Sequence, residues 1–266
     1  ETTAASFSAN FYLGATDSDD GSSSANDFDD TLMGGYDFQI GLTTSFTGED
    51  SLAVTIDSGN AGGAGYAEFA GDDTADKLTV DGVSYTFPLG GATVFVGDNT
   101  DGSALFTTAC VYGGPGDTLD DCGNVNAGIT GGALSAGASY DFGNGFTAAT
   151  GLQTNNDGVL TDEAMDSVGF NVAYTGDDYG LSFTYGVTET STDDEDAAVA
   201  FNGYYTPEGL PSISAGYESV DIGGAAADVD TKESIFFGLT WDEVGPGSAG
   251  VAAGYSNLLE NADESY

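Results

Sequence analysis

The feature that most restricts the fold of this chain is a two-residue hydrophobic period that returns in thirteen separate segments. One of them reads VGFNVAY over residues 168–174. Successive side chains of a β-strand point to opposite faces, so each segment predicts a strand with one apolar and one polar face. The polar face carries mainly Ser, Thr, Asn, Gly and Asp. The alternation by itself fits both a β-sandwich, whose apolar face is buried, and a barrel whose apolar face contacts lipid.

The connections between the thirteen segments provide a second constraint, because they alternate in length. Short connections are expected at 47–50, 88–91, 143–145, 176–178, 207–209 and 242–247. Long connections are expected at 17–33, 58–77, 98–131, 154–166, 189–197 and 221–232. Outer-membrane barrels carry short turns at one rim and long loops at the other, whereas a Greek-key sandwich has no reason to keep this rhythm.

Aromatic residues gather on the apolar face beside the short connections. They are Phe46, Phe87, Phe142, Phe146, Tyr174, Tyr179 and Tyr205. Aromatic girdles of this kind mark the lipid–water interfaces of membrane barrels. The alternative is a set of aromatic plugs at the ends of a soluble sandwich core. The sequence therefore favours an all-β fold, a transmembrane antiparallel β-barrel in the outer membrane, with periplasmic short turns and extracellular long loops.

The charge balance excludes several classes of function. The chain has 44 acidic residues, no Arg and no His, and its only basic residues are Lys77 and Lys232, giving a formal net charge of −42. Such a chain does not bind nucleic acid phosphates. Without His it has no His-based catalytic triad and no imidazole metal site, and we expect no enzymatic activity. The acidity indicates either a solvated surface in a salty medium or a field that attracts cations.

Four stretches of the chain resemble a known family: SFTGED (45–50), VSYTFPLGGATVFVG (83–97), TTACVYGGPGDTLDDCGN (107–124) and GASYDFGNGFTAATGL (137–152). They are similar to the major outer-membrane porins of cyanobacteria, in the carbohydrate-selective porin family. The resemblance covers nearly the whole chain. It implies a homotrimer of barrels with about 16 strands each. These barrels lie in outer-membrane lipid and lipopolysaccharide, and small hydrophilic solutes and ions diffuse through them passively.

Family members normally hold the cell wall through an N-terminal S-layer-homology domain, and we expect residues 1–266 not to include this domain, because a predicted strand follows almost directly on residue 1. Only 13 strands are readable, and a closed single-chain barrel of this class has an even number. We therefore expect residues 1–266 to be an incomplete barrel.

The longest connection, 98–131, is the third long one. By resemblance, this is the position of the loop that folds into a porin and narrows its channel. An even Cys count in an exported chain predicts a disulfide between Cys110 and Cys122 within this inserted constriction loop. The alternatives are two free thiols, or an extracellular loop tied only for stability. The carboxylates expected at the constriction are those of Asp101, Asp117, Asp120 and Asp121.

Other polar-face residues are expected to line the pore wall: Asp37, Gln39, Asp57, Asp141 and Glu218. Rings of Asp and Glu favour cations, so we expect a cation-preferring channel. No cofactor is expected. Weakly bound Ca²⁺ or Mg²⁺ at the acidic runs DSDD (17–20) and DDED (193–196) is weighed against simple solvation, since neither run fits the EF-hand spacing. The rival interpretation is an acidic extracellular structural or adhesive β protein that calcium stabilises.

Overall fold

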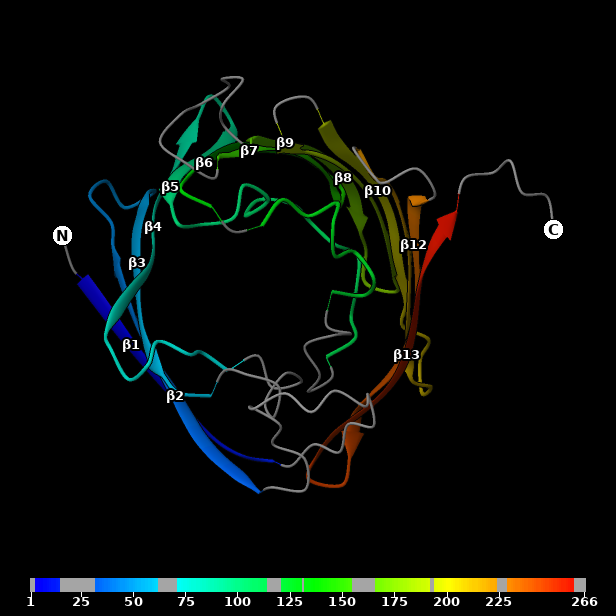
Figure 1. Ribbon diagram of the computed structural model, residues 1–266, viewed down its shortest axis with the longest axis horizontal. Helices are drawn as coiled ribbons and strands as arrows, with labels where there is room; N and C mark the ends of the chain where they lie inside the picture. Colours follow the sequence, from blue (N-terminus) through cyan, green and yellow to red (C-terminus); the bar gives the residue numbers. More distant parts are fainter. Residues whose placement is uncertain are drawn as a thin grey trace. The chain divides into compact units, whose positions relative to one another are not determined.

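The computed structural model describes residues 3–14, 32–61, 71–113, 121–130, 132–154, 166–191, 194–223 and 229–260. It contains 13 strands, as the sequence predicts, and hydrogen-bonded neighbours follow the order of the chain (Figure 1). Every pairing that the structure describes is antiparallel. Within these residues, no helix has the length and apolar character needed to cross a membrane.

The chain divides into two compact units within β4. The first unit holds β1 (Thr3–Gly14), β2 (Met33–Thr44) and β3 (Ser51–Gly59), and it includes the beginning of β4 (Thr79–Leu89). The second unit holds β5 (Ala92–Asp98), β6 (Leu134–Gly143), β7 (Phe146–Thr154), β8 (Asp166–Thr175), β9 (Tyr179–Ser191), β10 (Asp194–Tyr205), β11 (Ser212–Asp221), β12 (Val229–Val244) and β13 (Gly247–Glu260).

On strands of the second unit such as β8 and β10, the apolar side chains are exposed and the polar side chains are buried. On β8, Phe170 is 44% exposed while its neighbour Asn171 is only 1% exposed. The same inversion holds on β10, where Phe201 is 53% exposed and Asn202 is buried. A soluble sandwich buries its apolar face, so this arrangement is the opposite of what the adhesin interpretation requires. It is the arrangement of a sheet whose outer face contacts lipid.

Aromatic side chains cover the outer face beside the short turns, as predicted. The rings of Phe146 and Tyr174 lie 4.8 Å apart, and those of Tyr174 and Tyr179 lie 5.2 Å apart. Phe46, Phe142, Phe146, Tyr179 and Tyr205 are at least half exposed. Contacts between neighbouring rings stabilise adjacent strands and leave much of the aromatic surface open to the surroundings.

Several predicted connections are shorter in the structure: those at 88–91 and 221–232 lose residues to β4 and β12, and two others change more. Residues 189–197 were expected to form a long loop, but β9 continues to Ser191 and β10 begins at Asp194. Glu195 pairs with Glu189, and Asp196 pairs with Thr188. The antiparallel pairing of β9 and β10 therefore continues into this acidic, Thr-rich stretch. The expected turn at 242–247 also shortens, since β12 extends to Val244 and β13 begins at Gly247. The strict alternation of long and short connections therefore fails between β9 and β10.

Candidate pore lining

The long segment between β5 and β6, residues 99–133, is called the β5–β6 loop below. In Figure 1 the described parts of this loop, residues 99–113 and 121–130, run along the inner side of the curved strands of the second unit. Its two ends are tied together, because the Asn99 amide donates to the Ala133 carbonyl at 2.7 Å. A small core forms where the loop meets the sheet, around Ala127, Ala198, Ala200 and Val220. The loop therefore covers the polar face rather than projecting from it.

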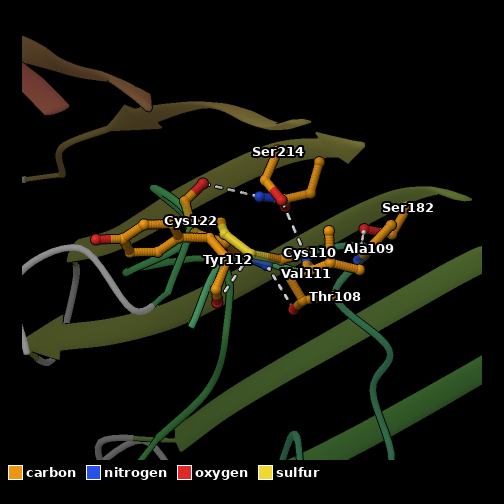
Figure 2. The surroundings of a disulfide bond; sticks show 10 residues. Thr108, Ala109, Cys110, Val111, Tyr112, Cys122, Ser182 and Ser214 are labelled. Carbon is orange, nitrogen blue, oxygen red and sulfur yellow. Dashed lines mark hydrogen bonds between the residues drawn. A yellow bond between two sulfur atoms is a disulfide. The ribbon is translucent and has the colours of Figure 1, made fainter. Parts of the chain in front are cut away.

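A disulfide joins Cys110 and Cys122, as predicted, with the two Cα atoms 6.3 Å apart (Figure 2). The strands beneath hold the loop on both sides of this bond. The Ala109 amide donates to Ser182 Oγ of β9 at 2.9 Å, and the Val111 amide donates to Ser214 Oγ of β11 at 3.0 Å. From β10, Asn202 Nδ2 donates to the Cys122 carbonyl at 2.9 Å. Short polar side chains from three successive strands thus replace the water that would otherwise satisfy the loop backbone.

Two amide side chains of the strands hold the backbone of the β5–β6 loop. Asn171 Oδ1 on β8 accepts the Thr107 amide at 2.9 Å, and its Nδ2 donates to the Thr107 carbonyl at 3.1 Å. Gln153 on β7 accepts the Gly102 amide at 2.8 Å and donates to the Thr130 carbonyl at 2.8 Å. An amide side chain has both donors and an acceptor, so it pairs with loop backbone as another strand would.

Glu218 on β11 is a predicted wall residue, and it lies on the polar face beneath the loop. Its side chain is 1% exposed. Oε1 accepts the backbone amides of Asn126 and Ala127, both at 2.7 Å, and Oε2 accepts Asn126 Nδ2 at 2.6 Å. Three donors satisfy a buried carboxylate without a basic partner. Glu218 therefore anchors the β5–β6 loop, and it does not face open water.

Glycines on the polar face let the loop backbone lie directly against the strands. A Cβ on Gly151 of β7 would collide with the Gly102 carbonyl, and one on Gly216 of β11 would collide with the Cys122 carbonyl. Tyr112 of the β5–β6 loop packs edge-on against Phe236 of β12, with ring centroids 5.4 Å apart. These positions fix how closely the loop approaches the wall.

The predicted constriction acids are only partly within the described residues. Asp101 and Asp121 lie in the β5–β6 loop and both are exposed. Their backbones form turns, since the Asp101 carbonyl accepts the Ala104 amide and the Asp121 carbonyl accepts the Asn124 amide. Asp117 and Asp120 lie outside the described residues.

Three predicted wall residues lie together in the first unit. Asp37 on β2 is 7% exposed and accepts Asn10 Nδ2 at 2.9 Å and the Tyr12 hydroxyl at 2.5 Å. Gln39 is exposed and lies directly opposite Asp57 of β3 in the ladder. Asp57 is 3% exposed, and its Oδ1 has no hydrogen-bond partner among the described residues. The polar face of this unit is therefore strongly acidic.

The fifth predicted wall residue, Asp141, lies at a strand end. It is exposed, and its Oδ1 accepts the Gly143 amide at 2.7 Å in the short turn between β6 and β7. Its carboxylate therefore shapes that turn.

One acid near the wall was missed by the sequence analysis. Asp72 follows β3 along the chain, and its carbonyl accepts the Ala61 amide at 3.0 Å. Partial burial raises the pKa of the Asp72 carboxyl above its ordinary value, and the neighbouring charges of Asp37 and Asp81 raise it further. In the part of the chain that the structure describes, no three acidic or Cys side chains are placed to hold a metal ion.

The loop anchors were also missed: Gln153, Asn171, Ser182, Asn202 and Ser214. Each occupies a polar-face position, which is the only signal in the sequence. Their loop partners lie between 23 and 103 residues away along the chain, so no local pattern connects them.

Comparison with known proteins places this geometry in a structural class. No family model matches the chain, and no curated protein matches it significantly. Solved structures do match: a mutant of the Rh. blastica porin has a TM-score of 0.62 at 14% identity, covering 96% of this chain and 84% of that chain. This chain has a porin fold. Salmonella typhi OmpF, solved in complex with daunomycin, gives a TM-score of 0.59 at 11% identity, covering 96% of this chain and 78% of that one.

The outer membrane channel DcaP of Acinetobacter baumannii is a third neighbour, with a TM-score of 0.52 at 13% identity over 97% of this chain and 94% of that chain. All three neighbours are porins or channels by their names. At these identities the likeness establishes the fold: an antiparallel all-β sheet of the porin β-barrel type. The more specific cyanobacterial, carbohydrate-selective assignment stays a prediction.

Proposed function

We propose that this protein is an outer-membrane channel through which small hydrophilic solutes and ions diffuse passively, without a chemical step. The observation that carries the proposal is the inverted sheet, with Phe170 and Phe201 exposed on one face and Asn171 and Asn202 buried on the other. Such a sheet is stable where lipid covers its outer face. The porin fold of the chain supports the same conclusion.

The proposed channel prefers cations. Charged rings select ions by sign, and the candidate lining is acidic in both units, with Asp37 and Asp57 on strands and Asp101 and Asp121 in the β5–β6 loop. With 44 acidic and two basic residues, the chain has little positive charge to place opposite these acids. The loop would form the constriction, because the strands of the second unit hold it against their polar face.

The resemblance to cyanobacterial porins adds three parts to the proposal. The protein would assemble as a homotrimer in lipid and lipopolysaccharide, with short turns in the periplasm and long loops outside. It would be joined to the cell wall through a further domain. Weak binding of Ca²⁺ or Mg²⁺ to the acidic loops would be compatible with this role. Resistance of the oligomer to detergent until it is boiled tests the assembly.

The decisive experiment is single-channel recording of the protein in a planar bilayer under a KCl gradient. We expect discrete conductance steps and a reversal potential that indicates K⁺ over Cl⁻. Replacing Asp117, Asp120 and Asp121 together with Asn should lower the K⁺ preference if these acids form the filter. Anion preference would contradict the electrostatic part, and the absence of channels from correctly folded protein would contradict the function itself.

A further inference from the structure

Asp57 is a buried carboxylate that the fold of the first unit leaves incompletely satisfied. Its side chain is 3% exposed, and Oδ1 has no hydrogen-bond partner among the described residues. The Gln39 side chain, opposite Asp57 in the ladder, hydrogen-bonds the Asp57 carboxylate, but this leaves Oδ1 unsatisfied. A buried ionised carboxylate with an unsatisfied oxygen is costly, so such a group takes up a cation or a proton. Asp57 lies on the polar face of β3, so an ion bound by its carboxylate would lie at the candidate pore lining.

Asp57 lies within electrostatic reach of other carboxylates of the first unit. Asp37 is held in place by Asn10 and Tyr12, and Asp57 interacts electrostatically with Asp37, Asp72 and Asp81. The segment that carries Asp72 is packed closely against this face. A Cβ on Gly71 would lie 2.7 Å from Ala61 Cβ and 3.1 Å from Tyr12 Cε2. These interacting acids come from β2, β3, β4 and the segment that follows β3.

Positive charge is scarce in this unit. Lys77 is the only basic residue among the first 83 residues, and it is exposed. The described acids are not grouped closely enough for three of them to enclose a bare metal ion. A cation that keeps much of its water shell needs only one or two direct carboxylate contacts, so it does not need three acids to enclose it.

We propose that the unpartnered Oδ1 of Asp57, with Asp37 and Asp72 beside it, binds a hydrated alkali-metal cation on the wall of the channel. This inference rests on the proposed function, because it names a resting position for the ions that the channel would carry. The Asp57 oxygen supplies the direct contact, and the other two carboxylates supply negative potential. The hydrogen bonds from Asn10 and Tyr12 hold Asp37 in a fixed orientation.

Thallium(I), a heavy stand-in for K⁺, allows a direct test. Crystals of the protein at pH 7, soaked in a thallium(I) salt, should show an anomalous peak beside Asp57 Oδ1. The peak should disappear in Asp57→Asn and persist in Asp141→Asn, which removes an exposed acid from the second unit. Crystals without a peak at Asp57 but with thallium at other acids would overturn the proposal and indicate that Asp57 is protonated instead.

A second measurement works even if Asp57→Asn folds poorly. The unfolding temperature of the wild-type protein in detergent should be higher in KCl than in N-methyl-D-glucamine chloride of equal ionic strength, and equal temperatures would count against the site.

Recordings in bilayers separate the two proposals. A thallium peak together with channels that lack cation preference would retain the site and reject the selectivity, whereas cation preference without the peak would do the reverse.

Discussion

Glu218 shows how a single buried residue positions a loop of more than thirty residues. Its carboxylate accepts three hydrogen bonds from Asn126 and Ala127. In Glu218→Gln, the new amide would face the Asn126 side chain with a donor instead of an acceptor. Hydrogen bonds to charged groups contribute about 1.5–3 kcal/mol, so we expect a loss of this order in the free energy of unfolding.

Unfolding by urea in detergent micelles measures this loss, and open-channel noise should rise as the β5–β6 loop loosens. Asp221→Asn is the matched control, since it removes an exposed carboxylate from the end of the same strand. If both variants were equally stable, the anchoring role of Glu218 would have to be abandoned.

Asp72 provides a prediction about pH. Burial and the nearby charges of Asp37 and Asp81 raise the pKa of its carboxyl above the ordinary value of 3.8. Between the unfolded and the folded pKa the folded state holds more protons, so stability falls as pH rises through this interval. We therefore expect Asp72→Asn to be more stable than wild type at neutral pH and equal to it below about pH 3.8.

Thermal unfolding from pH 3 to pH 8 in low-salt buffer measures this difference. High KCl should reduce it, because added cations screen the repulsion that raises the pKa. An Asp72→Asn variant that is less stable than wild type at pH 7 would show that the carboxylate makes a net stabilising contact.

At the scale of elements, the short turn between β2 and β3 explains the residue pattern of SFTGED, residues 45–50. Asp50 Oδ1 accepts the Phe46 and Thr47 amides at 2.9 and 2.8 Å and the Ser45 hydroxyl at 2.7 Å. Asp50→Ala would leave these donors without their acceptor, and we expect a loss of about 1–3 kcal/mol in the free energy of unfolding.

Refolding yield into detergent and the urea midpoint would both report this loss. Glu49→Ala alters an exposed neighbour in the same turn and should leave both quantities near wild type. Equal effects of the two substitutions would contradict the prediction that the hydrogen bonds of Asp50 stabilise this turn.

The strands were predictable because their signal is local, as in VGFNVAY, whose side chains alternate between the two faces. Their pairing was predictable because each strand pairs with the strands that precede and follow it in the chain. The hairpin from β9 to β10 was not predictable from composition, since its acids and threonines look like a loop until the ladder between Glu195 and Glu189 is known. The loop disulfide could be inferred from two Cys residues. Its anchors could not, because Ser182 and Asn202 differ in no way from other polar-face residues until the loop lies on them.

At the scale of the whole molecule, the direction of the apolar face decides between a membrane channel and a soluble acidic protein. Phe170, near the middle of β8, is exposed on the apolar face, and Gln39 of β2 is exposed on the polar face. If lipid covers the apolar face, Phe170→Lys should cost about 2–4 kcal/mol in the bilayer. Gln39→Lys should cost little, because it places a positive charge opposite Asp57.

Reversible folding of both variants into lipid vesicles, followed by tryptophan fluorescence of Trp241, measures these free energies. A soluble protein would show no such penalty, since a lysine at an exposed position on a water-facing surface usually changes stability by less than about 0.5 kcal/mol. The change in the free energy of folding caused by Phe170→Lys thus distinguishes a membrane channel from a soluble acidic protein. A penalty confined to Phe170→Lys would assign the apolar face to lipid, and equal small effects in both variants would assign it to water.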